Sequence, residues 1–497
     1  MLTNSYPSNA YLAFDLGASS SRAILGRLSG SCLHMEELHR FSTPIISEGE
    51  QLYWDLEALW LELQTGLQRA LNATSRLCSL SVDSWGVDYV PVNGFGNSLR
   101  NAYCYRSPRT VGMMAKVLQQ VSAAELYGAT GIQFMDMNTL PQVLADGEQE
   151  SALFQSTANR LMIADYFNYR FSGRAVAEVS LASTTGLMNV QSRTWARELM
   201  HRLGIPADNW PEIVPSGTRL GSVSACPEVT VIAGCSHDTA CAVAAVPAAP
   251  KSEPWAYLSC GTCSLVGVER TFPLLTEVAR QREFTNEVGL DGSVRFLTNL
   301  TGLWVLQECE REWKNLGERY DYDTLLSEAA AAPDRGVLID FNESCFQFRG
   351  NMQHKLQDYC REKGMPVPQH RGEVTRVILS SLASTYRRTL RALEEVIEER
   401  LEVLHIVGGG ARNPLLCQWT ADTCGCQVVA GPAEATALGN LLIQARTMGH
   451  LPIGVSIREV VRNSSNLKVY QPGSENLKKG AVHAQGYTLT ENHRRHS

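Results

Sequence analysis

Long apolar runs and a basic leader are both missing from this sequence. No stretch approaches the roughly 18 apolar residues of a membrane-spanning helix, because the best candidate is interrupted by His237 and Asp238. The first residues, MLTNSYPSNAYLAFDLG, do not place a positively charged segment before an apolar one, so they do not predict a signal peptide. We therefore expect a cytoplasmic location and no membrane partner.

Positive charge is also scarce. The 497 residues carry 44 Lys and Arg against 51 Asp and Glu, for a net charge of -7. Because a phosphate backbone is bound by a basic face, nucleic acid is not expected as a partner. The 14 cysteines are scattered, and the close pairs Cys260/Cys263 and Cys424/Cys426 lack neighbouring ligands that would complete a metal site. Free thiols and small-molecule chemistry are the resulting expectations.

Two common nucleotide-binding motifs are absent. The chain has neither the Gly-Lys dipeptide of a Walker A loop nor the Gly-x-Gly-x-x-Gly of a Rossmann fold. It has instead three successive glycines, Gly408 to Gly410, between an apolar strand and a helical pattern that starts at Pro414. Such glycines remove side chains where an adenosine must lie flat against backbone, and Asn413 suits a helix N-cap.

An apolar strand, a turn of small residues and a second strand occur twice, at residues 10–28 and 255–268. This repetition predicts two related domains. The Pro- and Ala-rich residues 244–254 suit the connector between them. The class is α/β, with further strands expected at 77–82, 89–92 and 401–407 and helices at 56–71 and 372–400. The expected domains are residues 9–246 and 255–455, followed by an extension, 456–497, whose polar end from residue 479 has little tendency to order.

The most informative segment is residues 231–242, in which His237, Asp238 and Thr239 stand among small and apolar residues. Small neighbours let a substrate come close, and a poorly solvated Asp suits a general base. Asp238 is therefore the first candidate catalytic residue. The alternative is that Asp238 caps a helix beginning at Thr239.

The first turn, DLGASSSR at residues 15–22, places a carboxylate at the end of a strand before small residues. Backbone N–H groups of such a turn can approach an anion, and Asp15 can hold Mg²⁺ directly or through water. An ordinary polar turn is the alternative.

Asp15-Leu-Gly, the Gly261-Thr262 turn, His237-Asp238-Thr239 and the glycine loop occur in the order expected of the FGGY carbohydrate kinases of the actin/Hsp70/hexokinase-like superfamily. The chain resembles this family over residues 11 to about 446. The resemblance implies two ribonuclease H-like (actin-like ATPase) domains with a catalytic cleft between them. Further matching segments are VDSWGVDY (82–89), YRSPRT (105–110), GIQF (131–134), NTL (138–140), LMIADYF (161–167), TNE (285–287) and GPAEA (431–435).

The same resemblance implies a role for each candidate residue. Asp238 is the base that takes a proton from a sugar's primary hydroxyl, whose oxygen attacks the γ-phosphorus of MgATP. The expected ketose-binding residues are Gly86, His237, Asp238, Thr239 and Asn299. The expected ATP-binding residues are Ala18, Ser19, Ser20, Ser21, Arg22, Thr262, Gln307, Gly409 and Gly410. Asp15 is expected to bind Mg²⁺, directly or through water.

The matching segments are most similar to kinases of the 6-deoxyketose L-rhamnulose. The methyl group of that sugar calls for an apolar wall, for which Trp85, Tyr89, Phe134 and Trp304 are candidates unless they are core aromatics. Kinases of L-fuculose, L-xylulose or glycerol and a non-catalytic nucleotide-dependent sensor are the alternatives. Four residues depart from the family pattern, namely Ser21, Cys260, Cys263 and Val288.

Overall fold

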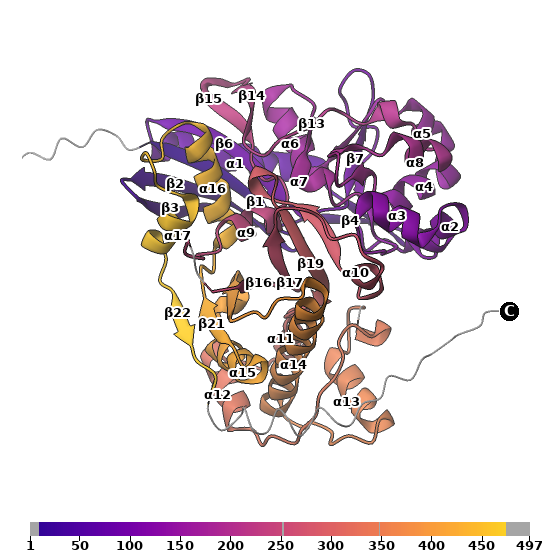
Figure 1. Ribbon diagram of the computed structural model, residues 1–497. Helices are drawn as coiled ribbons and strands as arrows, with labels where there is room; N and C mark the ends of the chain where they lie inside the picture. Colours follow the sequence, from indigo (N-terminus) through magenta and orange to yellow (C-terminus); the bar gives the residue numbers. More distant parts are fainter. Residues whose placement is uncertain (1–8, 251–252, 347, 474–497) are drawn as a thin grey trace, which may run out of the picture.

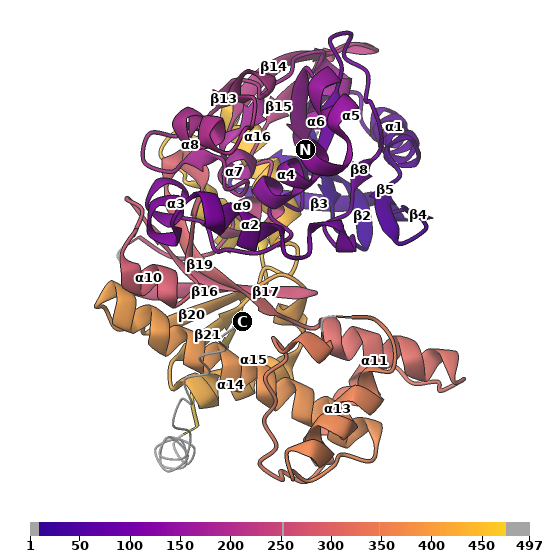
Figure 2. The same cartoon turned by 90° about the vertical axis from the view of Figure 1, so that its right-hand side faces the viewer.

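The computed structural model describes residues 9–250, 253–346 and 348–473, so the polar end predicted from residue 479 lies outside the described residues. Its two large sheets lie in two halves of the molecule, one beside the other (Figures 1 and 2). The N-terminal sheet has the strand order β14-β15-β6-β1-β2-β3. Its strands are β1 (Ala10–Leu16), β2 (Ser20–Ser29), β3 (Cys32–Ser42), β6 (Leu77–Ser84), β14 (Thr218–Val223) and β15 (Cys226–Ala233).

The C-terminal sheet has the order β18-β19-β17-β16-β20-β21-β22. Its strands are β16 (Trp255–Cys260), β17 (Cys263–Arg270), β18 (Thr285–Val288), β19 (Val294–Thr301), β20 (Val403–Val407), β21 (Gln427–Ala430) and β22 (Lys468–Tyr470). The smaller sheets are formed by β4 (Ile45–Glu48), β5 (Gln51–Trp54), β7 (Tyr89–Val92), β8 (Ala102–Tyr103), β9 (Asn159–Met162), β10 (Ala177–Glu178), β11 (Met188–Asn189), β12 (Thr194–Trp195) and β13 (Ile213–Val214).

Both large sheets are built on the same plan. In the N-terminal sheet β1 pairs antiparallel with β2 and parallel with β6, and β2 pairs antiparallel with β3. In the C-terminal sheet β16 pairs antiparallel with β17 and parallel with β20, and β17 pairs antiparallel with β19. The N-terminal order β3-β2-β1-β6-β15 therefore has its counterpart in β19-β17-β16-β20-β21. The α/β class, both hairpins and the duplicated topology predicted from the sequence are confirmed.

The helices cover these sheets. In chain order they are α1 (Leu56–Ala73), α2 (Met113–Gln120), α3 (Ala123–Thr130), α4 (Thr139–Gln149), α5 (Ser151–Ser156), α6 (Ile163–Ser172), α7 (Val179–Ala182), α8 (Arg197–Arg202), α9 (Asp238–Ala244), α10 (Glu277–Gln281), α11 (Trp304–Asn315), α12 (Tyr322–Ala331), α13 (Met352–Glu362), α14 (Arg371–Ile397), α15 (Pro414–Cys424), α16 (Ala435–Thr447) and α17 (Ile457–Ser464). No helix in the described part of the chain is both long and apolar enough to cross a membrane.

Strand β1 is buried on both faces because its side chains alternate between two hydrophobic clusters. Leu12 and Phe14 belong to the cluster that contains the apolar side chains of α1 and α6. Tyr11 and Ala13 point the other way, into a cluster formed by α9, α16 and α17. That second cluster also contains Tyr257 of the C-terminal sheet, so α9 and α16 join the two halves.

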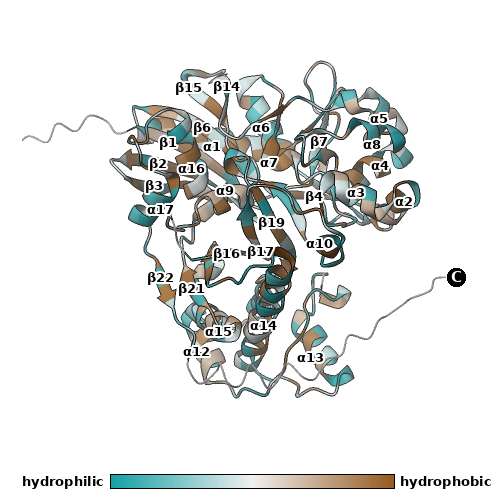
Figure 3. Cartoon of the chain, viewed as in Figure 1, coloured by the Kyte–Doolittle hydropathy of each residue, from teal (hydrophilic) through white to brown (hydrophobic). Residues whose placement is uncertain are grey.

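Helix α16 lies between β21 and β22 of the C-terminal sheet in sequence but packs on the N-terminal sheet (Figure 1). It carries hydrophobic residues (Figure 3). A Cβ at Gly439 would lie 2.0 Å from the Cys241 carbonyl oxygen, so this glycine lets α16 approach α9. Gln444 ties the helix to the sheet: its Nε2 donates to the Leu12 carbonyl oxygen at 3.0 Å, and its Oε1 accepts from Ser79 at 2.7 Å. Helix α16 thus links the two halves, in addition to the connector that the sequence predicts at 244–254.

Candidate functional site

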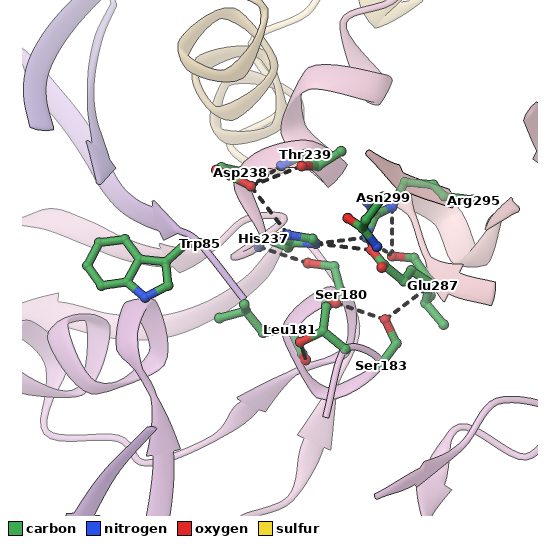
Figure 4. Close-up of polar contacts among 12 residues, drawn as sticks. Trp85, Ser180, Leu181, Ser183, His237, Asp238, Thr239, Glu287, Arg295 and Asn299 are labelled. Atoms are coloured by element: carbon green, nitrogen blue, oxygen red, sulfur yellow. Dashed lines mark hydrogen bonds and ion pairs between the residues drawn. The ribbon is translucent and has the colours of Figure 1, made fainter. Parts of the chain in front are cut away.

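The His237-Asp238-Thr239 segment lies where β15 turns into α9 (Figure 4). Ser84 on the neighbouring strand holds this turn, because its backbone N–H donates to the Ser236 carbonyl oxygen at 2.9 Å. Asp238 is the first residue of α9 and His237 is the N-cap, so the alternative that Asp238 caps a helix starting at Thr239 is wrong. The Asp238 side chain is 31% exposed, which is more open to water than its small apolar neighbours suggest.

The two oxygens of the Asp238 carboxylate differ in their contacts. Oδ1 accepts from the Thr239 backbone N–H at 2.5 Å and from the Thr239 hydroxyl at 3.1 Å. His237 Nε2 lies 3.3 Å from the same oxygen. Oδ2 has no hydrogen-bond or ion-pair partner among the described residues. One oxygen is therefore held by the protein while the other is available to a substrate.

The buried carboxylate of Glu178 holds this turn through hydrogen bonds. It accepts from the backbone N–H groups of Ser236 at 3.0 Å and Ser180 at 2.9 Å. The Ser180 hydroxyl in turn accepts from the His237 N–H at 3.1 Å. Burial raises the pKa of Glu178, and these donors oppose the rise. Sequence reasoning missed Glu178 and Ser180 because no motif marks them.

On the other side, His237 meets two side chains of the C-terminal sheet. Arg295 Nη2 lies 3.0 Å from His237 Nδ1, and Glu287 Oε2 lies 3.4 Å from it. Arg295 and Glu287 also form an ion pair of 3.0 Å. Figure 4 shows the three side chains together, with Asn299 close by. The sequence singled out the segment containing Glu287 without giving that residue a role, and it did not mark Arg295.

Asp15 and Asp83 lie at the ends of adjacent parallel strands as Cα partners. Asp15 accepts from Arg22 at 2.5 Å, and Arg22 also pairs with Glu434. Burial raises the pKa of Asp15, Arg22 opposes this, and Asp238 and Glu434 raise it further. Asp83 is fully buried with a raised pKa, and only one of its oxygens is bonded, to Asn440 at 2.6 Å.

This acidic cluster fits a hard cation. The described residues contain no group of three or more His, Cys, Asp or Glu side chains placed to hold a metal. A magnesium site does not need three such side chains. Mg²⁺ usually keeps several bound waters and takes one or two carboxylates plus substrate phosphates. Neighbouring carboxylates that raise the pKa of Asp15 show that positive charge is favoured there. Arg22, expected at the phosphates, is already paired with two carboxylates.

The turn between β1 and β2 presents Ser19 and Ser20 to solvent, with Ala18 half-buried beside them. Ser21 differs, because its side chain is fully buried and its hydroxyl bonds to the Thr43 hydroxyl at 2.8 Å. The hydroxyl added at this position relative to the family pattern is thus satisfied within the protein.

The corresponding turn between β16 and β17 joins the start of α11. The Thr262 carbonyl oxygen accepts from the Trp304 N–H at 3.1 Å. The Thr262 hydroxyl donates to Gln307 Oε1 at 3.2 Å, which brings two predicted nucleotide-binding residues together. Cys260 is buried and Cys263 exposed, and both are free thiols.

Packing explains two of the three glycines at 408–410. Gly408 has φ 83°, which favours glycine. A Cβ at Gly410 would lie 2.2 Å from the Cys260 sulfur, whereas one at Gly409 would meet nothing within 4 Å. Backbone conformation and packing thus account for Gly408 and Gly410, and the interpretation of the glycines as a platform for adenosine stays a prediction. Asn413 is the N-cap of α15 as predicted, since its side chain accepts from the Leu416 N–H at 2.9 Å.

Packing also explains why residue 86 is a glycine. A Cβ there would lie 3.1 Å from the Thr184 hydroxyl oxygen, so the missing side chain leaves room for Thr184. The next residue, Val87, has φ 68°, a strained conformation for a β-branched residue. Its carbonyl oxygen accepts from the Thr139 hydroxyl at 2.7 Å, which holds the strained turn in place.

The four aromatic candidates for an apolar wall are placed differently. Tyr89 is 2% exposed and bonds to Asp146, as a core residue does. Trp85 is also buried, with its indole N–H donating to Asp88 at 3.0 Å. Phe134 and Trp304 are half-buried, and the Arg106 guanidinium lies 5.3 Å from the Trp304 ring centre. Asn299 bonds through Nδ2 to Gln133 Oε1 at 3.2 Å, which links it to the segment that carries Phe134.

Comparison with known proteins matches each half of the chain to its own family model. The model of the N-terminal domain of the FGGY family of carbohydrate kinases matches residues 10–245, and that of its C-terminal domain matches residues 256–448. A rhamnulokinase of Bacteroides thetaiotaomicron is 37% identical over 469 residues, covering 93% of this chain and 96% of that protein. A rhamnulokinase of Pectobacterium carotovorum is 39% identical over 470 residues, covering 93% of each. The crystal structure of a gluconate kinase from Lactobacillus acidophilus shares the fold with a TM-score of 0.76, at 14% identity and 96% coverage of each chain.

Proposed function

Because this chain belongs to the FGGY family of carbohydrate kinases, we propose that it transfers the γ-phosphoryl group of ATP to the primary hydroxyl of L-rhamnulose. The products are L-rhamnulose 1-phosphate and ADP, and the reaction is a step in L-rhamnose breakdown. The choice of sugar is supported by the rhamnulokinases that match nearly the whole chain. The observation that carries the chemistry is the carboxylate of Asp238, with one oxygen fixed and one without a partner among the described residues.

Asp238 acts as the general base. Its Oδ2 accepts the proton of the primary hydroxyl as the hydroxyl oxygen attacks the γ-phosphorus, and the bond from that phosphorus to the ADP oxygen breaks. Phosphoryl transfer depends mainly on positioning and on charge stabilisation, so a base held by Thr239 and His237 suits it. A non-catalytic sensor is the less favoured alternative, because sensing does not require a base.

We assign the sugar to the boundary where the two halves meet. Gly86, His237, Asp238, Thr239 and Asn299 are its proposed contacts. Phe134 and Trp304 are the half-buried aromatics that remain candidates for the wall beside the methyl group. We also propose that the cleft between the two halves closes during catalysis.

The nucleotide is proposed to contact both hairpin turns. The phosphate contacts are Ala18, Ser19, Ser20, Ser21, Arg22 and Thr262, and Gln307, Gly409 and Gly410 are the other nucleotide contacts. Asp15 would hold Mg²⁺, directly or through water, and the ion would neutralise charge on the phosphate oxygens. The proposed domains are residues 9–246 and 255–455 with an extension at 456–497, and ATP dependence favours a cytoplasmic location.

A coupled ADP-release assay tests the proposal. The purified chain is supplied with MgATP and, in parallel, with L-rhamnulose, L-fuculose, L-xylulose, D-xylulose and glycerol. We expect the highest kcat/KM with L-rhamnulose. Preference for another sugar would keep the phosphoryl transfer and refute the assigned substrate, while ADP release with none of them would refute the kinase.

A further inference from the structure

A buried ion pair of the C-terminal sheet contacts the candidate base through His237. Glu287 on β18 and Arg295 on β19 are direct Cα partners. Arg295 is fully buried and Glu287 is 5% exposed. Both side chains reach across the boundary between the halves to His237, which belongs to the N-terminal half (Figure 4).

The arginine determines which ring nitrogen of His237 carries the proton. A guanidinium only donates hydrogen bonds, so the Nδ1 atom 3.0 Å from Arg295 must be the acceptor. In the neutral ring the proton is then on Nε2, the nitrogen that lies 3.3 Å from Asp238 Oδ1. The N–H of the histidine ring is then on the nitrogen next to the carboxylate oxygen that Thr239 already holds.

Glu287 keeps this arrangement electrically balanced. Burial alone would raise its pKa, but the Arg295 guanidinium opposes burial, and the pKa of Glu287 is lowered. An ionised Glu287 compensates the charge of the fully buried arginine, which would otherwise be costly. Arg295 is also fixed by the Val288 carbonyl oxygen, which accepts from its Nη2 at 3.3 Å.

We propose that Glu287 and Arg295 are positioning residues that hold His237 as the neutral Nε2–H tautomer. His237 then keeps Asp238 Oδ1 engaged and leaves Oδ2 directed at the sugar hydroxyl. The inference rests on the proposed function, in which Asp238 is the base. It also links the base of the N-terminal half to the sheet of the C-terminal half.

The test variant is Glu287→Gln combined with Arg295→Met, which removes both charges and so leaves neither buried without a partner. The matched control is Glu269→Gln combined with Arg458→Met, because Glu269 and Arg458 form an ion pair of 2.6 Å at the same sheet without a recorded contact to His237. Both variants are first checked for cooperative thermal unfolding. The single variant Glu287→Gln, which can still accept from Arg295, is measured alongside them.

We expect kcat of the test variant to fall by about 10- to 100-fold, as when a reacting group loses its alignment, with KM for ATP within about twofold of wild type. The control should keep wild-type kcat. Unchanged kcat in the folded test variant would overturn the proposal.

The tautomer of His237 is determined independently of activity by NMR of protein labelled with ¹⁵N-histidine, in the absence of substrates. The variant His237→Asn identifies the His237 signals. We expect a neutral Nε2–H ring in wild type and loss of that single tautomer in the test variant. A wild-type ring protonated on Nδ1 would overturn the proposal. If none of the sugars is phosphorylated but the tautomer behaves as stated, the proposed function fails and the positioning of His237 stands.

Discussion

The β1–β2 turn and the β16–β17 turn occupy equivalent positions in two sheets of the same strand order, but among the described residues only the first carries an ion-pair network. Asp15, Arg22 and Glu434 form an ion-pair network at the first turn. At the second, the Thr262 side chain bonds to the neutral Gln307. We therefore expect the duplicated turns to divide their tasks, with charge control in the N-terminal half and neutral contacts in the C-terminal half.

The strands that pair parallel with β1 and β16 extend this comparison. In the N-terminal half β6 ends with Asp83, whose pKa burial raises well above its ordinary value. In the C-terminal half β20 carries His405, whose pKa burial lowers to about 4. Burial favours the neutral form in both cases. The carboxylates of Asp15 and Asp238 raise the pKa of Asp83 further, whereas the charge of Arg458 lowers the pKa of His405 further.

The largest effect should come from removing the base in the N-terminal half. We expect Asp238→Asn to lower kcat by roughly 100- to 10,000-fold, the usual contribution of a general base. Sugar affinity, measured by calorimetry, should change little because the amide has nearly the same shape. Asp208→Asn, at a surface ion pair, is the control. Turnover within a fewfold of wild type would remove Asp238 from the mechanism.

Stability of the C-terminal half should depend on pH through His405. Its folded pKa of about 4 lies below the unfolded value of 6.5, so the unfolded state binds more protons between these values. The contribution of neutral His405 to the free energy of unfolding is therefore complete above pH 6.5. It is lost as the pH falls to 4, by up to roughly 3 kcal/mol.

Urea unfolding of wild type and His405→Asn at several pH values measures this contribution. The difference in unfolding free energy between the two proteins should shrink in acid. A difference that stays constant from pH 7 to pH 4 would refute the assigned cause.

The acidic network of the first turn is probed by Asp15→Asn. We expect kcat to fall by roughly 10- to 100-fold, the usual cost of losing a group that orients a metal through its water shell. The Mg²⁺ concentration for half-maximal rate should rise as well. Glu36→Gln on the adjacent strand β3, which pairs with Arg27 at the surface, is the control. An unchanged magnesium requirement would argue against a role of Asp15 in metal binding.

The smallest effect is expected at the neutral turn. Thr262→Val removes one hydroxyl, so KM for ATP should rise by about fivefold, equivalent to about 1 kcal/mol, while kcat stays near wild type. Thr262→Ser, which keeps the hydroxyl, should behave as wild type. A large loss of kcat in Thr262→Val would show that the two turns do not divide their tasks as described.

Features controlled by neighbouring residues could be predicted from the sequence. Both hairpins were predictable because apolar strands flank small-residue turns, and α15 because Asn413 and Pro414 are typical of a helix start. Helix α14 was predicted to residue 400 but ends earlier, because Glu398 adopts a left-handed conformation that no local pattern indicated.

Features controlled by distant residues could not be predicted. Asn440 bonds to Asp83 across 357 positions, and Arg295 meets His237 across 58. The glycine loop shows the same limit, since the residue that requires Gly410 is Cys260, a neighbour only in the folded chain. Sequence patterns thus singled out Asp238 as a candidate but did not indicate the side chains that hold it.

The most direct test of the central claim is the structure of the reaction product. L-Rhamnulose is incubated with MgATP and the chain, and the product is analysed by ¹H–³¹P correlation NMR. We predict phosphorus coupled to the protons on carbon 1, with one ADP formed per sugar phosphate. Absence of a sugar phosphate, or phosphorus on any other carbon, would contradict the account.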